Sequence, residues 1–163
     1  MIARLKGKLS YKSPEFIIVD VNGVGYQAFI PLSTFCNLPE QGSEVELDIY
    51  THLREDALQL YGFLTPQEKR AFELLIGVSE IGPRLARNIL SGISVEELSR
   101  AIFEEDRQTL MSIPRVGKKL ADKLVVELKD KIDKIAPSVM KEVRSRGGLI
   151  EDALSALINL GYK

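Results

Sequence analysis

The middle of the chain contains an internal duplication, in which a pattern of small and apolar residues recurs at an offset of 35 residues. The first copy has Leu75, Val78, Ile81, Gly82, Leu85 and Ala86, and the second has Leu110, Ile113, Val116, Gly117, Leu120 and Ala121. Each copy predicts a helix, a tight turn that ends in glycine, and a second helix that begins directly after this glycine. The duplication therefore predicts two equivalent pairs of short helices.

The turn glycines, Gly82 and Gly117, predict two phosphate-binding sites. Glycine has no Cβ, so the backbone at these positions can come close to a ligand. The first N–H groups of the following helix lack intrahelical acceptors, and the helix dipole makes this end electropositive. Basic residues near the glycines extend the candidate sites: Arg84 and Arg87 in the first copy, and Arg115, Lys118, Lys119 and Lys123 in the second. Because phosphate contacts carry no base information, the expected DNA binding is independent of sequence.

The local charge favours a polyanion, although the formal net charge of −1 does not. Over residues 114–123 the four basic side chains stand against one acidic residue, Asp122. Attraction to a phosphate is screened within about 10 Å at moderate salt, so a local cluster matters more than the total charge. A run of charges is usually only a solvated helix face, and this simpler interpretation stays open beside phosphate contact.

Residues 1–63 predict an all-β domain. The pair Asn22-Gly23 lies between two apolar runs and favours a hairpin, because it tolerates the positive φ of tight turns. Strict alternation over residues 44–50 places Val45, Leu47 and Ile49 on one face of a strand, and a second hairpin is expected around residues 54–57. Five or six short strands in this length suit a small closed barrel such as an OB-fold.

The remaining chain reads as helical. Thr65 with Glu68, and Ser94 with Glu97, form capping-box patterns, so residues 64–135 predict an all-α domain. Residues 136–148 contain a proline, two glycines and no apolar periodicity, which predicts a flexible linker. Residues 149–163 begin a helix with apolar spacing that cannot bury its apolar face alone. Either this helix packs elsewhere, or it is the first helix of an incomplete third domain.

The two copies resemble tandem helix–hairpin–helix motifs over residues 78–86 and 113–121. These motifs usually have glycine, a hydrophobic residue and glycine in each hairpin, whereas Glu80 and Arg115 replace the first glycine here. If this position needs positive φ, each hairpin carries strain. A carboxylate near a phosphate also makes the first hairpin the weaker candidate site.

The whole chain resembles the RuvA family. The resemblance rests on the stretch Arg54-Glu55-Asp56-Ala57-Leu58-Gln59-Leu60-Tyr61-Gly62-Phe63, the two hairpins, and the ending Leu160-Gly161-Tyr162. It implies a subunit without catalytic activity of its own that binds four-way (Holliday) DNA junctions in recombination, repair and the SOS response. It also implies an acidic pin formed by Glu55 and Asp56, which faces the crossover and repels phosphates. The simpler interpretation is that these two are turn residues on a solvated hairpin.

The resemblance further implies partners. The working form would be a homotetramer, with the pairing of two tetramers into an octamer left open. A RuvB-type AAA+ motor would bind through the C-terminal domain, which makes residues 149–163 an incomplete motor-binding domain. A RuvC-type resolvase would share the complex. The implied location is the cytoplasm, associated with the bacterial nucleoid.

Other function classes find little support in the sequence. The single cysteine, Cys36, excludes an intramolecular disulfide, and no apolar run approaches the roughly 20 residues that span a membrane. Residues 77–84 resemble a P-loop in glycine spacing, but Pro83 and Arg84 replace the required residues, so no ATP site and no cofactor are expected. The alternatives are a helix–hairpin–helix repair enzyme, or a generic DNA-binding accessory protein whose barrel binds single strands.

Overall fold

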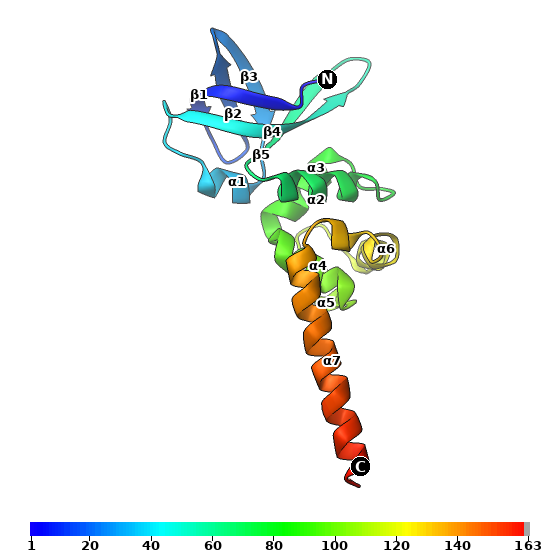
Figure 1. Ribbon diagram of the computed structural model, residues 1–163. Helices are drawn as coiled ribbons and strands as arrows, with labels where there is room; N and C mark the ends of the chain where they lie inside the picture. Colours follow the sequence, from blue (N-terminus) through cyan, green and yellow to red (C-terminus); the bar gives the residue numbers. More distant parts are fainter. Residues whose placement is uncertain (162–163) are drawn as a thin grey trace.

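The computed structural model describes residues 1–161 and consists of a closed β-barrel, a group of short helices and one long C-terminal helix (Figure 1). The strands are β1 (Arg4–Lys12), β2 (Phe16–Val21), β3 (Val24–Phe29), β4 (Glu44–Leu53) and β5 (Leu58–Phe63). The helices are α1 (Leu32–Asn37), α2 (Pro66–Ile76), α3 (Pro83–Gly92), α4 (Val95–Phe103), α5 (Arg107–Met111), α6 (Lys118–Leu128), the 3₁₀ turn η1 (Ile132–Lys134) and α7 (Pro137–Asn159). This order confirms the predicted fold class, a β-barrel followed by helices.

The barrel closes in the strand order β1-β2-β3-β5-β4. Its neighbours are antiparallel except β3 and β5, which pair in parallel at Phe29 and Tyr61. The predicted hairpin joins β2 and β3, with φ of 52° at Asn22 and 93° at Gly23. The alternating residues Val45, Leu47 and Ile49 all lie in the barrel core, as their spacing predicted.

Aromatic packing and a side-chain hydrogen bond connect the barrel domain to the helices. The aromatic rings of Tyr61 and Phe63 in β5 pack against Phe72 of α2, with centroids 5.2 and 5.0 Å apart. The N–H of Glu68 donates to the hydroxyl of Thr65, which is the expected cap of α2. The Glu68 carboxylate accepts a hydrogen bond of 2.8 Å from the hydroxyl of buried Thr34 in α1. Burial of this carboxylate raises the pKa of Glu68 above its ordinary value.

Helix α7 corrects the prediction of a flexible linker over residues 136–148, because the helix runs through this segment. Pro137 suits its first turn, and Met140 and Val143 are buried against the short helices, so packing stabilises its start. Two glycines in the helix interior cost about 1 kcal/mol each relative to alanine, which the helix tolerates. The spacing of Met140 and Val143, three residues apart, is the sequence signal that indicates these first turns.

The second half of α7 projects away from the other helices (Figure 1). Its exposed apolar residues are Leu149, Ile150, Leu154, Leu157 and Ile158. Residues 162–163 of the predicted C-terminal segment lie outside the described residues. Within residues 1–161, no helix combines the length and the apolar character needed to cross a membrane.

Candidate nucleic-acid interface

The two copies of the duplicated pattern have nearly the same backbone. In the first turn the N–H of Val78 donates to the carbonyl of Leu75 at 3.0 Å, and the equivalent bond from Ile113 to Leu110 is 3.2 Å. The glycines that precede α3 and α6 also match. Gly82 has φ −90° and ψ 175°, and Gly117 has φ −90° and ψ −178°. Two helix–turn–helix units of the predicted form are therefore present.

The first turns of α3 and α6 differ from those of their neighbours in how they are capped. The side chains of Thr65, Ser94 and Asp106 accept a backbone N–H at the start of α2, α4 and α5. By contrast, Gly82 and Gly117 cap α3 and α6 without any side-chain acceptor. The N–H groups at these two helix ends are left for an acceptor from outside the helix.

Neither glycine is required by the fold of the described residues. Both have extended backbone angles that any residue adopts, and a Cβ built on Gly82 or Gly117 would meet nothing within 4 Å. The space in front of each helix end is therefore open. An anion can approach these N–H groups more closely than it could if a side chain were present.

The two residues that depart from the usual hairpin pattern, Glu80 and Arg115, adopt the strained positive-φ conformation expected at this position. Glu80 has φ of 71° and Arg115 has φ of 69°, both in the left-handed region. This region costs a residue with a Cβ roughly 1–2 kcal/mol. Each hairpin thus carries one strained residue two positions before its turn glycine.

The structure places Glu80 between the two hairpins. Its Oε1 lies 3.1 Å from the Nζ of Lys123 and 3.8 Å from the Nζ of Lys119, both in α6. The hydrogen bond from Lys123, followed by the charge of Lys119, lowers the pKa of Glu80 below its ordinary value. Two of the lysines predicted to bind phosphate therefore already face a carboxylate.

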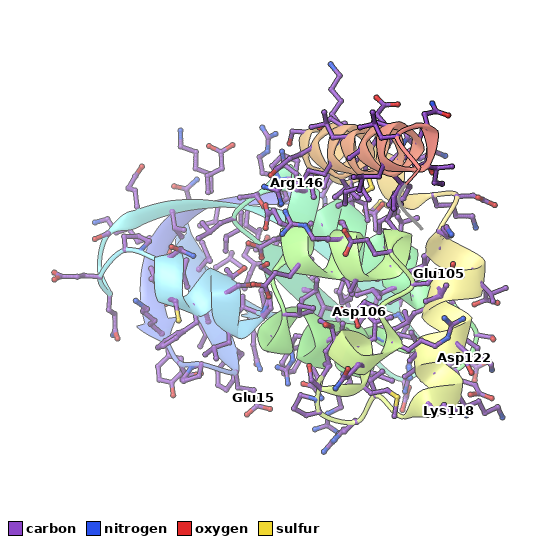
Figure 2. The ribbon with its side chains drawn as sticks, turned by 90° about the horizontal axis from the view of Figure 1, so that it is seen from below. Glu15, Glu105, Asp106, Lys118, Asp122 and Arg146 are labelled. Carbon is purple, nitrogen blue, oxygen red and sulfur yellow. The ribbon has the colours of Figure 1, made fainter. Side chains whose placement is uncertain are left out.

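The other predicted basic residues have different surroundings. Lys118 is exposed and, in Figure 2, lies at the edge of the molecule opposite α7. Arg115 is exposed ahead of Gly117. Arg87 is partly engaged by the fold, because its Nη1 donates to the carbonyl of Glu15 at 3.0 Å and its guanidinium lies 5.7 Å from the Phe29 ring centroid. Arg84 lies beside Gly82 at the start of α3.

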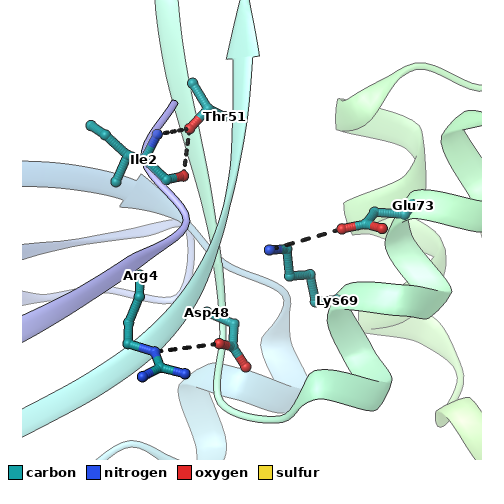
Figure 3. A network of polar contacts seen from close by, with 6 residues as sticks. All are labelled: Ile2, Arg4, Asp48, Thr51, Lys69 and Glu73. Carbon is teal, nitrogen blue, oxygen red and sulfur yellow. Dashed lines mark hydrogen bonds and ion pairs between the residues drawn. The ribbon is translucent and has the colours of Figure 1, made fainter.

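The acidic pair Glu55 and Asp56 lies at the turn of the β4–β5 hairpin, closed by a 2.8 Å bond from the N–H of Arg54 to the carbonyl of Ala57. Both acidic residues are exposed, and no ion pair engages either of them within residues 1–161. The β4 strand of this hairpin contacts the amino-terminal segment through Thr51, which exchanges two hydrogen bonds with Ile2 (Figure 3). Its tip therefore presents two unpaired negative charges on a braced hairpin.

The potential metal-ligating side chains of the described residues lie apart from one another. Among residues 1–161, no three His, Cys, Asp or Glu side chains are grouped closely enough to hold a metal ion. His52 is the single histidine, and its Nε2 accepts a hydrogen bond of 3.1 Å from the Nε of Arg54. It lies on β4, as the sequence analysis expected of a strand residue.

Comparison with known proteins identifies the family. The model of the RuvA N terminal domain matches residues 1–62, and the model of the SAM-like helix-hairpin-helix tandem matches residues 72–130. A Holliday junction branch migration complex subunit RuvA from Geotalea daltonii is 50% identical over the whole chain, which spans 84% of that relative. The chain belongs to the RuvA family.

Other relatives carry the same name and show similar identity. The Geobacter sulfurreducens subunit is 52% identical over the whole chain and 84% of its own length, and the Syntrophobacter fumaroxidans subunit is 48% identical over the whole chain and 83% of its own length. In this RuvA-family chain, the match to the helix-hairpin-helix tandem includes both turn glycines. The resemblance on which the sequence analysis relied is thereby confirmed.

Proposed function

We propose that the protein binds four-way DNA junctions without sequence specificity, as the non-catalytic subunit of a branch-migration complex. The observation that carries this proposal is the pair of equivalent, glycine-capped helix ends at Gly82 and Gly117, in a chain whose relatives are named Holliday junction branch migration complex subunits. Each open helix end binds one phosphate through backbone N–H groups and the helix dipole. Two such ends on one unit grip the two strands of a duplex arm.

The basic residues add charge to this grip. Lys118 and Arg115 approach the phosphate at the second hairpin, and Arg84 approaches the one at the first. Lys119 and Lys123 bind phosphate after leaving Glu80, because ion pairs between solvent-exposed side chains are weak and are easily exchanged. Contacts of this kind neutralise phosphates and release counterions, so binding weakens as salt rises.

The acidic tip gives the protein a preference for junctions. Four copies of the chain, arranged as a homotetramer, bring four pairs of Glu55 and Asp56 to the crossover. Their charges repel the phosphates there and keep the arms apart. A RuvB-type motor then moves the open junction, recruited through the C-terminal segment, and a RuvC-type resolvase binds the same open form.

A competition binding experiment tests this function. An immobile four-way junction is compared with duplex and single-stranded DNA of equal length, in the presence of magnesium. We expect a preference for the junction of about a hundredfold, which corresponds to about 2.8 kcal/mol in binding free energy at about 1.4 kcal/mol for each factor of ten. Equal affinity for junction and duplex would leave a generic helix–hairpin–helix protein, and preference for single strands would assign the binding to the barrel.

A further inference from the structure

We propose that a groove between the β4–β5 hairpin and the start of α3 binds a DNA phosphodiester next to the crossover, with Arg54 as its additional cation. The groove has a volume of about 360 Å³. Its two sides are lined by residues from different parts of the fold, among them His52, Arg54 and Tyr61 from the barrel, and Gly82, Arg84 and Arg87 from the helical part. This inference rests on the proposed function, and it adds a contact from the barrel to those expected of the hairpins.

Three guanidinium groups converge on this groove. The Tyr61 hydroxyl lies among them and donates to the Oε1 of Gln59 at 3.4 Å. Burial raises the pKa of Tyr61, while the charges of Arg87, Arg54 and Arg84 act in the opposite direction on the same hydroxyl. The three cations are therefore close enough to one point to act on it together, although they come from two different parts of the fold.

No carboxylate within the described residues forms an ion pair with this cluster. None of the ion pairs in residues 1–161 includes Arg54, Arg84 or Arg87. Glu15 lines the groove, yet Arg87 bonds to its backbone carbonyl rather than its carboxylate. Like charges held together repel one another, so an anion bound among them is stabilised. Guanidinium groups suit a phosphodiester because their planar N–H groups can bind two of its oxygens at once.

Neighbouring contacts hold two of these arginines in place before any ligand arrives. Arg87 is positioned by the Glu15 carbonyl and the Phe29 ring. The Nε of Arg54 donates to the Nε2 of His52. This bond occupies the Nε of Arg54, so the terminal Nη groups of Arg54 remain for a ligand. Since both side chains are already ordered, less conformational entropy is lost when an anion binds.

The groove also explains how the two hairpins differ. The second hairpin is followed by two lysines of its own, Lys118 and Lys119, whereas the first has Pro83, which lacks an N–H, directly after Gly82. In the groove, Arg54 of the barrel adds a cation beside the first hairpin, on the side of the acidic tip. Because Arg54 directly precedes Glu55, a phosphate bound here lies beside the acidic tip. The groove therefore holds the strand where it passes from the arm to the crossover.

The test compares Arg54→Gln with Lys8→Gln, a matched loss of one exposed positive charge from the barrel outside the groove. Affinity for a four-way junction and for linear duplex is measured from about 50 to 200 mM salt, with thermal unfolding as a check on folding. We expect Arg54→Gln to weaken junction binding about tenfold or more and to lower the salt slope by roughly one unit per bound protomer. We also expect it to change duplex binding less than twofold, and Lys8→Gln to leave both affinities within twofold.

Two further variants separate this inference from the proposed function. Arg54→Lys keeps the charge without the planar fork, so it should restore the salt slope and only part of the junction affinity. Lys118→Gln reports on the second hairpin and should weaken junction and duplex alike. If the parent prefers junctions and the Arg54→Gln protein binds junctions as tightly as the parent does, the phosphate site in the groove is refuted and the proposed function is not. Equal losses on duplex and junction would also refute the phosphate site, and a parent without junction preference would overturn both.

Discussion

Replacing Gly117 by serine should stabilise the protein and weaken its binding to DNA. The added side chain meets nothing within 4 Å, and the backbone angles at Gly117 suit a helix cap. Its hydroxyl can accept the N–H of Leu120, as Ser94 accepts the N–H of Glu97 at 3.1 Å in α4. A side-chain cap contributes a few tenths of a kcal/mol over glycine, and the lost freedom of the unfolded chain contributes about 0.4–1 kcal/mol more. The expected gain is about 0.6–1.5 kcal/mol, or roughly 1–6 °C in Tm.

The same hydroxyl occupies the position that a phosphate would take. A hydrogen bond to a charged group is worth about 1.5–3 kcal/mol, so its loss weakens DNA binding by roughly ten- to a hundredfold per hairpin. Thermal unfolding followed by circular dichroism and fluorescence anisotropy with a labelled junction measure the two effects. Stability and affinity should move in opposite directions.

Ser94→Gly is the matched control, because it removes an existing side-chain cap from α4, a helix that does not follow a turn glycine. It should lower stability by a few tenths of a kcal/mol and leave DNA affinity unchanged. A Gly117→Ser protein that is more stable and binds DNA as the parent does would refute the phosphate site. A less stable Gly117→Ser protein would refute the conclusion that the fold does not require this glycine.

Four more changes test other parts of the structure. Glu80→Gln frees Lys119 and Lys123, so junction affinity and the salt slope should rise in a salt titration, whereas weaker binding would mean that Glu80 positions these lysines. Neutralising the acidic tip with Glu55→Gln and Asp56→Asn should leave junction affinity unchanged or raise it. A large loss of affinity in this variant, but not in the control variant Glu40→Gln with Glu44→Gln, would contradict a repulsive pin. Gly147→Ala should strengthen α7 by about 1 kcal/mol and slow its amide exchange, whereas a flexible linker would show no change. The raised pKa of Glu68 stabilises the folded protein at pH values below the ordinary pKa of 4.5, and this stabilisation is lost as pH rises through the higher pKa of the folded state. Urea titrations should therefore show that the stability of Glu68→Gln relative to the parent increases over this pH range. A difference that stays constant with pH would contradict this expectation.

The sequence by itself determined the parts of the protein that depend on neighbouring residues. Alternation over residues 44–50 placed Val45, Leu47 and Ile49 in the barrel core, and the Asn22-Gly23 pair set the β2–β3 turn. The repeated apolar and glycine pattern produced two hairpins with nearly identical backbone angles. These features follow from residues at most a few positions apart, whose geometry is set by sterics, helix periodicity and turn preferences.

The tertiary structure alone decided which charged groups meet. Glu80 faces Lys123 from the other copy of the duplication, and Arg54 of the barrel shares a groove with Arg84 of the helices. The same packing turned the expected linker into the start of α7, through burial of Met140. Such contacts join residues far apart in the chain, so they depend on how the helices pack against one another and against the barrel, which no local pattern encodes. The two hairpins look alike in sequence and have the same backbone, yet packing surrounds them with different charges.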